Sequence, residues 1–289
     1  MSSDSYSLPD RLRALVAITR PTNVFITAVT IIVAGLIAGI TRDKFWILAI
    51  AAVSAAFLAA FGNVVNDIFD ISIDKINKPR RVLASGRLSI RSARFLAVAL
   101  AALGVVLAGL VSMPVLGIAV ISVAILYAYS SVLKHIPLVG NITVGLMTGL
   151  AFIYGGFAAG HPESGVIPAV FAFFYNIGRE ILKDIEDIEG DKAGKIRTFP
   201  IWVGAEYAMT VATVVFAVTV ALTFVPYVTG WYGWAYLAVV VIGVDAVLAA
   251  LMLSLWKTPT RGNIGRICLW LKYDMIVGIA AIYTGTHFS

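Results

Sequence analysis

Charge is scarce along this chain. Only 13% of its 289 residues are Asp, Glu, Lys or Arg, whereas 60% are hydrophobic. A soluble globular domain carries about 25% charged residues, so the composition excludes an ordinary soluble domain. The single cysteine, Cys268, excludes a disulfide within the chain. With three histidines besides, the sequence contains no Cys/His spacing typical of a zinc site.

Long apolar runs take the place of charge. A helix needs about 20 apolar residues to cross a bilayer, and nine runs approach that length. They cover residues 23–41, 45–65, 93–112, 114–130, 138–159, 165–182, 202–225, 232–256 and 268–286. Membrane barrels show alternating segments of about ten residues instead. We therefore expect an all-α, polytopic membrane protein, with residues 1–289 forming one domain of nine transmembrane helices.

Lys and Arg gather on one side of this arrangement. If every run crosses the membrane, the side opposite the N-terminus receives only Arg42 and Lys44. Basic residues favour the cytoplasmic side, so we expect a multi-pass cell-membrane protein with its N-terminus in the cytoplasm. With this topology the net charge of +6 is a surplus of positive charge on the cytoplasmic side of the membrane. Such a surplus suits binding of anionic lipid headgroups or of a phosphorylated substrate. No soluble basic module is present, so nucleic acid is not expected as a partner.

Two short stretches, 66–74 and 184–191, hold eight of the sixteen acidic residues. Each follows an apolar run and falls on the predicted cytoplasmic side. Carboxylates placed this close repel one another unless a cation holds them. A divalent metal that itself holds a phosphorylated ligand is the natural candidate. Ordinary juxtamembrane acids would explain one such stretch more easily than two, because carboxylates near the membrane are costly and usually functional.

The spacing within each stretch gathers oxygen atoms on one helix face. In the first, Asn66, Asp70 and Asp74 share a face, and Asp67 points about 100° away. The corresponding face of the second stretch is formed by Asp184, Asp187 and Asp191. Mg²⁺ takes one or two carboxylates and completes its shell with water and phosphate oxygens. Two such faces with basic flanks therefore suit a metal-bridged diphosphate.

The positions of the two stretches also raise the possibility of an internal duplication. The first stretch ends the second apolar run and the second ends the sixth, so that four-span units would carry one motif each. Residues outside the motifs show no clear identity between the two halves, and the sequence leaves the duplication open.

The two motifs resemble those of the UbiA superfamily of intramembrane prenyltransferases. Residues 66–74 fit its pattern Asn-Asp-x-x-Asp-x-x-x-Asp, and residues 187–191 fit Asp-x-x-x-Asp. Smaller signatures agree, namely Arg20-Pro21-Thr22-Asn23, Asn77-Lys78-Pro79, Tyr129-Ser130 and Gly140-Asn141. The resemblance implies nine helices around a central cavity with cytoplasmic caps. Residues 179–187 further resemble the archaeal-type digeranylgeranylglyceryl phosphate synthases within this superfamily.

That resemblance implies a magnesium-dependent transfer of a geranylgeranyl group from geranylgeranyl diphosphate to geranylgeranylglyceryl phosphate. The product would be an ether-lipid precursor, with release of diphosphate. Two Mg²⁺ ions are expected, held by Asn66, Asp70, Asp74, Asp187 and Asp191. Residues expected to bind the substrates are Arg20, Asn23, Lys78, Arg81, Lys134, Asn141 and Arg197. Asp67 and Asp184 would position the acceptor or support the metal ligands. Asp67 could also accept the proton of the acceptor hydroxyl. Tyr129 and Lys134 are further candidate catalytic residues.

Several of these residues have a structural alternative. Lys78 and Arg81 could serve only to set topology, Tyr129 could be an interfacial aromatic residue, and Asn141 could form a bond between helices. Three intramembrane charges stay unassigned. For Asp245 we favour a structural pair with Lys272, and the alternative is that it lines a polar acceptor pocket together with Asp274.

Two other functions compete with this interpretation. A prenyltransferase with an aromatic acceptor, as in quinone or chlorophyll-type synthesis, would share both metal motifs. A secondary transporter would use acidic and basic residues as an ion path, but transporters bind near the bilayer midplane at broken helices. Here the carboxylates cluster at helix ends, which disfavours transport.

Overall fold

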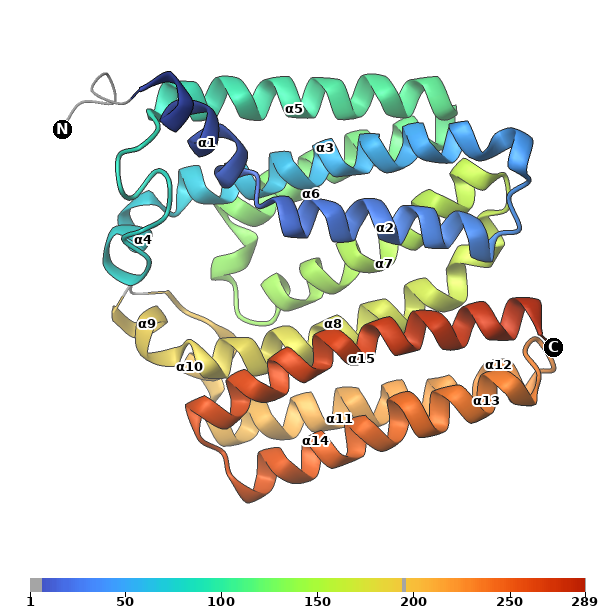
Figure 1. The fold of residues 1–289 in the computed structure, drawn as a ribbon. Helices are drawn as coiled ribbons and strands as arrows, with labels where there is room; N and C mark the ends of the chain where they lie inside the picture. The colour runs from blue at the N-terminus through green and yellow to red at the C-terminus, as the bar shows by residue number, and fades with distance from the viewer. Residues whose placement is uncertain (1–6, 194–195, 289) are drawn as a thin grey trace. The chain divides into compact units, whose positions relative to one another are not determined.

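The computed structural model describes residues 7–193 and 196–288, and over these residues the chain forms helices and no strand (Figure 1). The chain divides into two compact units. The first comprises Met1–Lys134 with Ile153–Glu163, and the second comprises His135–Phe152 with Ser164–Ser289. The all-helical prediction is confirmed, and each unit is described in its own frame.

The first unit is built around helix α3. Its helices are α1 (Leu8–Ile18), α2 (Pro21–Ile37), η2 (Arg42–Lys44), α3 (Phe45–Phe69), α4 (Ile71–Asn77), α5 (Ile90–Val111) and α6 (Met113–Ser131). The short helix η3 (Leu133–His135) and the long helix α7 (Val139–Ala159) run across the boundary between the units. Within the unit, α3 packs against α2, α5 and α6, as Figure 1 shows.

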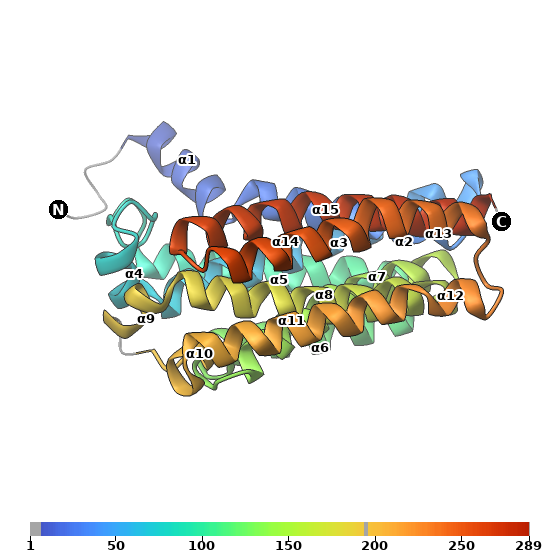
Figure 2. The same ribbon diagram turned by 90° about the horizontal axis from the view of Figure 1, so that it is seen from below.

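The second unit is organised by α8. Its elements are η4 (Pro162–Gly165), which begins in the first unit, α8 (Val166–Glu186), α9 (Ile188–Ala193), α10 (Phe199–Val203), α11 (Ala205–Thr223), α12 (Val225–Val228), α13 (Trp234–Val240), the π-helical segment η5 (Val241–Asp245), α14 (Ala246–Lys257) and α15 (Arg261–His287). Helix α8 packs against α11 and α15, and Figure 2 shows α8 beside α11 from a second direction.

Eight helices of the described residues are long and apolar enough to cross a membrane. A ninth span results if α1 and α2, which meet at an angle of 49°, are counted together. The predicted run 23–41 is thus shorter as a helix than expected, because α2 has only 17 residues. The bend arises at Arg20, whose φ of 54° is left-handed, and Pro21 then starts the new helix.

The polar segment after α3 is anchored to the first unit's core. Val82, Leu83 and Leu88 are buried and pack with Phe61 and Val64 of α3. Because these apolar side chains fix the segment, the acidic residues at the end of α3 lie next to an ordered chain rather than a loose tether.

In the second unit, α7 and α8 approach each other closely at two glycines. A Cβ atom at Gly145 would lie 2.7 Å from the carbonyl oxygen of Phe173, and one at Gly149 would lie 2.7 Å from that of Ala169. The glycines are four residues apart, the spacing by which small residues let membrane helices pack backbone to backbone.

One sequence prediction about the membrane charges is wrong. Asp245 does not pair with Lys272 in the described chain; its carboxylate lies 3.0 Å from the Thr223 hydroxyl of α11. Asp245 and Asp274 are buried, whereas Lys272 is exposed. The reason is the phase of α15. Its residue Asp274 faces the interior, and Lys272, two residues earlier, lies on a different face because positions two apart do not share a helix face.

We predict that Gly149→Ala destabilises the protein by about 1–3 kcal/mol, since the added methyl meets a backbone atom and the two helices must separate. Gly117→Ala in α6 is the matched control, because a Cβ at Gly117 meets nothing within 4 Å and alanine is the better helix former. Thermal unfolding of the purified chain in detergent measures both. Equal melting temperatures for the two variants would contradict close packing at Gly149.

Candidate active site

The first acidic motif lies at a joint between two helices. Helix α3 ends at Phe69, α4 begins at Ile71, and Asp70 caps both with φ −91° and ψ 3°. The backbone still follows the helical bonding pattern, because the amide of Asp70 donates to Asn66 O at 3.0 Å and that of Asp74 donates to Asp70 O at 2.7 Å. The motif residues therefore stay at helical spacing although the helix axis is interrupted.

Lys134 brings together two of the predicted metal ligands. Its ammonium lies 2.5 Å from Asp70 Oδ1 and 3.3 Å from Asn66 Oδ1. The Asn66 amide donates in turn to Asp70 Oδ2 at 2.9 Å. The Lys134 side chain is only 12% exposed, so a cation already occupies the point on which these oxygens converge.

Asp67 and Asp74 form a second cluster with two arginines. Arg20 donates to Asp67 Oδ1, and Arg81 lies 3.4 Å from the same oxygen and 2.7 Å from Asp74 Oδ2. Burial raises the pKa of the Asp74 carboxyl, and the bond from Arg81 opposes that rise. The structure thus places Asp74, a predicted metal ligand, in contact with Arg81.

Arg20 reaches this cluster from an unusual backbone conformation. Its φ of 54° and ψ of 71° lie in the left-handed region, which is uncommon for residues other than glycine and costs of order 1–3 kcal/mol. Such residues concentrate at functional sites. Here the conformation accompanies the contact between the Arg20 guanidinium and the buried carboxylate of Asp67.

The second motif repeats the joint of the first. Helix α8 ends at Glu186, α9 begins at Ile188, and Asp187 lies between them with φ −93° and ψ 3°. The amide of Asp191 donates to Asp187 O at 2.9 Å. One turn earlier, Asp184 accepts a 2.7 Å bond from the side chain of Asn141 on α7. These two predicted site residues thus join α7 to α8.

The sequence reasoning missed a charged cluster on α8 next to this motif. Glu180 is buried and accepts from Arg179 at 2.8 Å and from Lys183 at 3.0 Å. Its signal was the pair Arg179-Glu180 inside an otherwise apolar predicted span, since paired charges within a membrane segment are rarely incidental.

The other predicted site residues lie nearer the surface of their units. Asn23, Lys78 and Arg197 are exposed, and Tyr129 and Asp191 are half-buried. Tyr129 belongs to α6, the helix that precedes Lys134. The first unit thus joins Asn66 to Asp70 and Lys134, and Asp67 to Asp74, Arg20 and Arg81, while the second joins Asn141 to Asp184.

The chemistry of the motifs fits Mg²⁺. All the candidate ligand atoms are carboxylate or amide oxygens, which hard cations prefer. The Lys134 ammonium shows that Asn66 and Asp70 converge on a site for positive charge. Among residues 7–193 and 196–288, no group of three His, Cys, Asp or Glu side chains forms a complete metal site. Mg²⁺ needs only one or two carboxylates when phosphate and water supply its other ligands.

We predict that Asp67→Asn lowers the stability of the protein by about 2–3 kcal/mol, because it leaves the partly buried guanidinium of Arg20 without a counter-charge and removes one of the two carboxylates that Arg81 contacts. The control is Asp10→Asn, which removes a pair with Arg13 whose side chains are 50% and 84% exposed; exposed pairs contribute little. Thermal unfolding of both variants is the measurement, and an unchanged melting temperature for Asp67→Asn would contradict its role in holding the arginines.

Comparison with known proteins agrees with this geometry. Residues 27–271 match the model of the UbiA prenyltransferase family. The chain is similar to the digeranylgeranylglyceryl phosphate synthase of Methanopyrus kandleri, with 39% identity over 93% of this chain and 98% of the relative. It is likewise similar to the synthase of the same name from Natronomonas pharaonis, with 37% identity over 96% of this chain and 98% of the relative.

Solved structures extend the likeness to the fold. A structure from work on digeranylgeranylglyceryl phosphate synthase in membranes aligns with a TM-score of 0.79 and 32% identity, over 96% of this chain and 98% of that one. A UbiA homologue from Archaeoglobus fulgidus, solved with GPP and Mg²⁺ bound, aligns with a TM-score of 0.66 at 18% identity over 94% of this chain and 99% of that one. With its two acidic motifs at helix joints and a family match over most of its length, the chain belongs to the UbiA prenyltransferase family.

Proposed function

We propose that this chain is a digeranylgeranylglyceryl phosphate synthase. It transfers the geranylgeranyl group of geranylgeranyl diphosphate to the hydroxyl of geranylgeranylglyceryl phosphate. The observation that carries the proposal is the identity of 39% to a synthase of that name over nearly the full length of both chains. The cluster of Asn66, Asp70 and Lys134 supports it, because oxygen ligands beside a lysine suit a metal-bound diphosphate.

Mg²⁺ is the cofactor that fits these residues. Asn66 and Asp70 would hold it in the first motif, and Asp187 and Asp191 in the second. Bound there, it would neutralise diphosphate oxygens and make the diphosphate a better leaving group. We also propose that two Mg²⁺ ions bind and that Asp74 contributes to their binding. The pairing of Asp74 with Arg81 favours an indirect contribution.

The basic residues would act on the leaving group. Lys134 and Arg81 lie against the carboxylates of the first motif and would neutralise the charge that develops as the C1–O bond of the donor breaks. The electron pair of that bond leaves with diphosphate, and an allylic cation remains. The exposed side chains of Lys78, Arg197 and Asn23 would complete the binding of the phosphate groups as the substrates arrive.

The acceptor hydroxyl then attacks C1, the ether bond forms, and the hydroxyl proton is lost. We assign Asp67 to orientation rather than to proton transfer, because its Oδ1 already contacts two guanidiniums. The departing diphosphate is then the proton acceptor. Asp184, bonded to Asn141, would keep α7 in register with the second motif. From the bias of Lys and Arg toward one side of the predicted topology, we propose that both motifs face the cytoplasm.

The decisive experiment supplies purified protein with geranylgeranyl diphosphate and Mg²⁺. We expect ether product and pyrophosphate with geranylgeranylglyceryl phosphate, and no product with an aromatic acceptor such as 4-hydroxybenzoate. Chelation with EDTA should stop the reaction, because the diphosphate loses its counter-cation, and added Mg²⁺ should restore it. Transfer that continues in EDTA would refute the metal-dependent mechanism, and prenylation of the aromatic acceptor alone would replace the proposed substrate.

Substitution of the motif carboxylates tests the same proposal. Asp70→Ala and Asp187→Ala should each lower turnover by at least ~100-fold, since each removes charge stabilisation at the leaving group. Glu189→Ala is the matched control in α9, because the side chain of Glu189 is 82% exposed and pairs with Arg261 at the surface. Turnover is measured at saturating substrate, alongside melting temperature. Retained activity in either Asp variant would be incompatible with the assigned roles.

A further inference from the structure

Three charged residues of α8 form a cluster just before the second acidic motif. Glu180 is buried, and its two carboxylate oxygens accept from different cations, Arg179 at 2.8 Å and Lys183 at 3.0 Å. The side chain of Arg179 is 14% exposed, whereas that of Lys183 is 47% exposed. This α8 ion cluster therefore begins in the interior and ends on a lysine side chain that is accessible to a ligand.

The α8 ion cluster contains more positive than negative charge, because two cations share the single carboxylate of Glu180. Asp184, the residue after Lys183, is bonded to Asn141 of α7 instead. A lysine that served only to set topology would not need a buried carboxylate and a nearly buried arginine, since charges are costly to place inside a protein. The arrangement is that of a lysine held in position for an anion.

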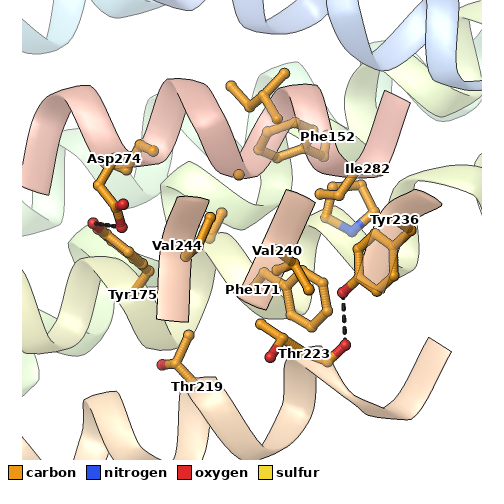
Figure 3. A pocket seen from close by; sticks show the side chains of 15 residues that line it. Phe152, Phe171, Tyr175, Thr219, Thr223, Tyr236, Val240, Val244, Asp274 and Ile282 are labelled. Atoms are coloured by element: carbon orange, nitrogen blue, oxygen red, sulfur yellow. Dashed lines mark hydrogen bonds between the residues drawn. The ribbon is translucent and has the colours of Figure 1, made fainter. Parts of the chain in front are cut away.

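Contacts with α15 hold α8 on both sides of this cluster. One turn before it, the Tyr175 hydroxyl lies 2.7 Å from Asp274 Oδ2, and Figure 3 shows these two side chains turned toward each other. One turn after it, a Cβ atom at Gly265 would lie 2.5 Å from Glu186 Oε1, so α15 passes close to α8 there as well. The cluster is therefore presented by a firmly packed helix.

Lys183 lies one helical turn from the second motif, on its membrane side. The amide of Asp187 donates to Lys183 O at 3.0 Å, so the two side chains share a face of the helix and are separated by about 6 Å along its axis. Lys183 precedes Asp187 within the membrane-spanning helix, whereas Asp191 follows it in α9. A group bound by Lys183 therefore lies nearer the apolar part of the helix than a group bound at Asp187 and Asp191.

This position suits the phosphate group of the acceptor in the proposed reaction. When the donor's diphosphate is bound at the acidic motifs, its apolar chain extends toward the membrane, and its reacting carbon C1 lies on that side of the motifs. The acceptor hydroxyl has to reach C1. In a glycerol that carries an ether chain and a phosphate at its two ends, the free hydroxyl is on the carbon next to the phosphate. The acceptor phosphate is thus expected at the level of Lys183.

We propose that Lys183 binds the phosphate monoester of the lipid acceptor, at a subsite separate from the metal-bound diphosphate, with Glu180 and Arg179 as positioning residues. The identity of the acceptor rests on the proposed function. An ammonium and a phosphate form charge-assisted hydrogen bonds, which are stronger than neutral ones. The subsite would therefore select a phosphorylated lipid over the same lipid without its phosphate, and would hold the neighbouring hydroxyl toward C1 of the donor.

Binding of tritiated geranylgeranylglyceryl phosphate to the whole protein in phosphatidylcholine nanodiscs tests the subsite without turnover. EDTA is present throughout, so that no metal bridges the phosphate to the acidic motifs. We expect saturable binding, at least ~10-fold tighter than that of geranylgeranylglycerol, which lacks the phosphate. Lys183→Gln should lose this preference, and Lys183→Arg should keep it, because a guanidinium also binds phosphate. Lys257→Gln is the matched control, since Lys257 is an exposed lysine at the end of α14.

Steady-state kinetics separate the acceptor subsite from the donor site. Lys183→Gln should raise KM for the acceptor at least ~10-fold and leave KM for geranylgeranyl diphosphate unchanged; a rise for the donor alone would overturn the subsite. So would equal binding of the two lipids by the wild type, no saturable binding in EDTA, or an undiminished preference in folded Lys183→Gln, with melting temperatures as the check on folding. Phosphate-selective binding that depends on Lys183 without any transfer would support the subsite and refute the proposed function.

Discussion

Pairing of each buried carboxylate with a cation is the interaction on which the first unit's site depends. The chain is mostly apolar, and the acids of the first motif lie around the joint between α3 and α4, where burial penalises an isolated charge. Arg20, Arg81 and Lys134 reach Asp67, Asp74 and Asp70 from three separate segments. The three basic residues therefore compensate the carboxylates and also attach the start of α2, the segment after α4 and the short helix η3 to the joint between α3 and α4. Removal of any one of them would affect charge balance and geometry together.

Much of this could be predicted from the sequence, because the relevant signals are local. The apolar runs predict the helices, and the spacing of Asn66 and Asp70 predicts oxygen atoms on a shared face. Partners that come from distant segments leave no such local trace. Nothing in the sequence links Asp245 with Thr223 rather than Lys272, since helix phase and packing decide which side chains meet. The buried group of Arg179, Glu180 and Lys183 was visible as charge inside an apolar run, but its inward orientation was not.

The two helix joints bear on the duplication that the sequence left open. Asp70 and Asp187 follow long helices, precede short ones, and share nearly the same backbone angles, with φ of −91° and −93° and ψ of 3° in both. Each is followed four residues later by an aspartate whose amide donates back to it. This correspondence supports a repeated unit with one motif each, which stays a prediction. It also suggests how the carboxylates are oriented. At Asp70 and Asp187 the long helix is interrupted, while the backbone hydrogen bonds keep the motif residues at helical spacing.

The glycines of α7 have a consequence for how hydrophobic molecules move through the second unit. Asn141, Gly145 and Gly149 follow one another at intervals of four residues, and their contacts on α8 run from Asp184 past Phe173 to Ala169. Backbones this near each other leave no gap wide enough for a hydrocarbon chain. Over that stretch the seam between α7 and α8 is closed to lipid, and an isoprenoid that enters sideways from the bilayer has to pass between a different pair of helices.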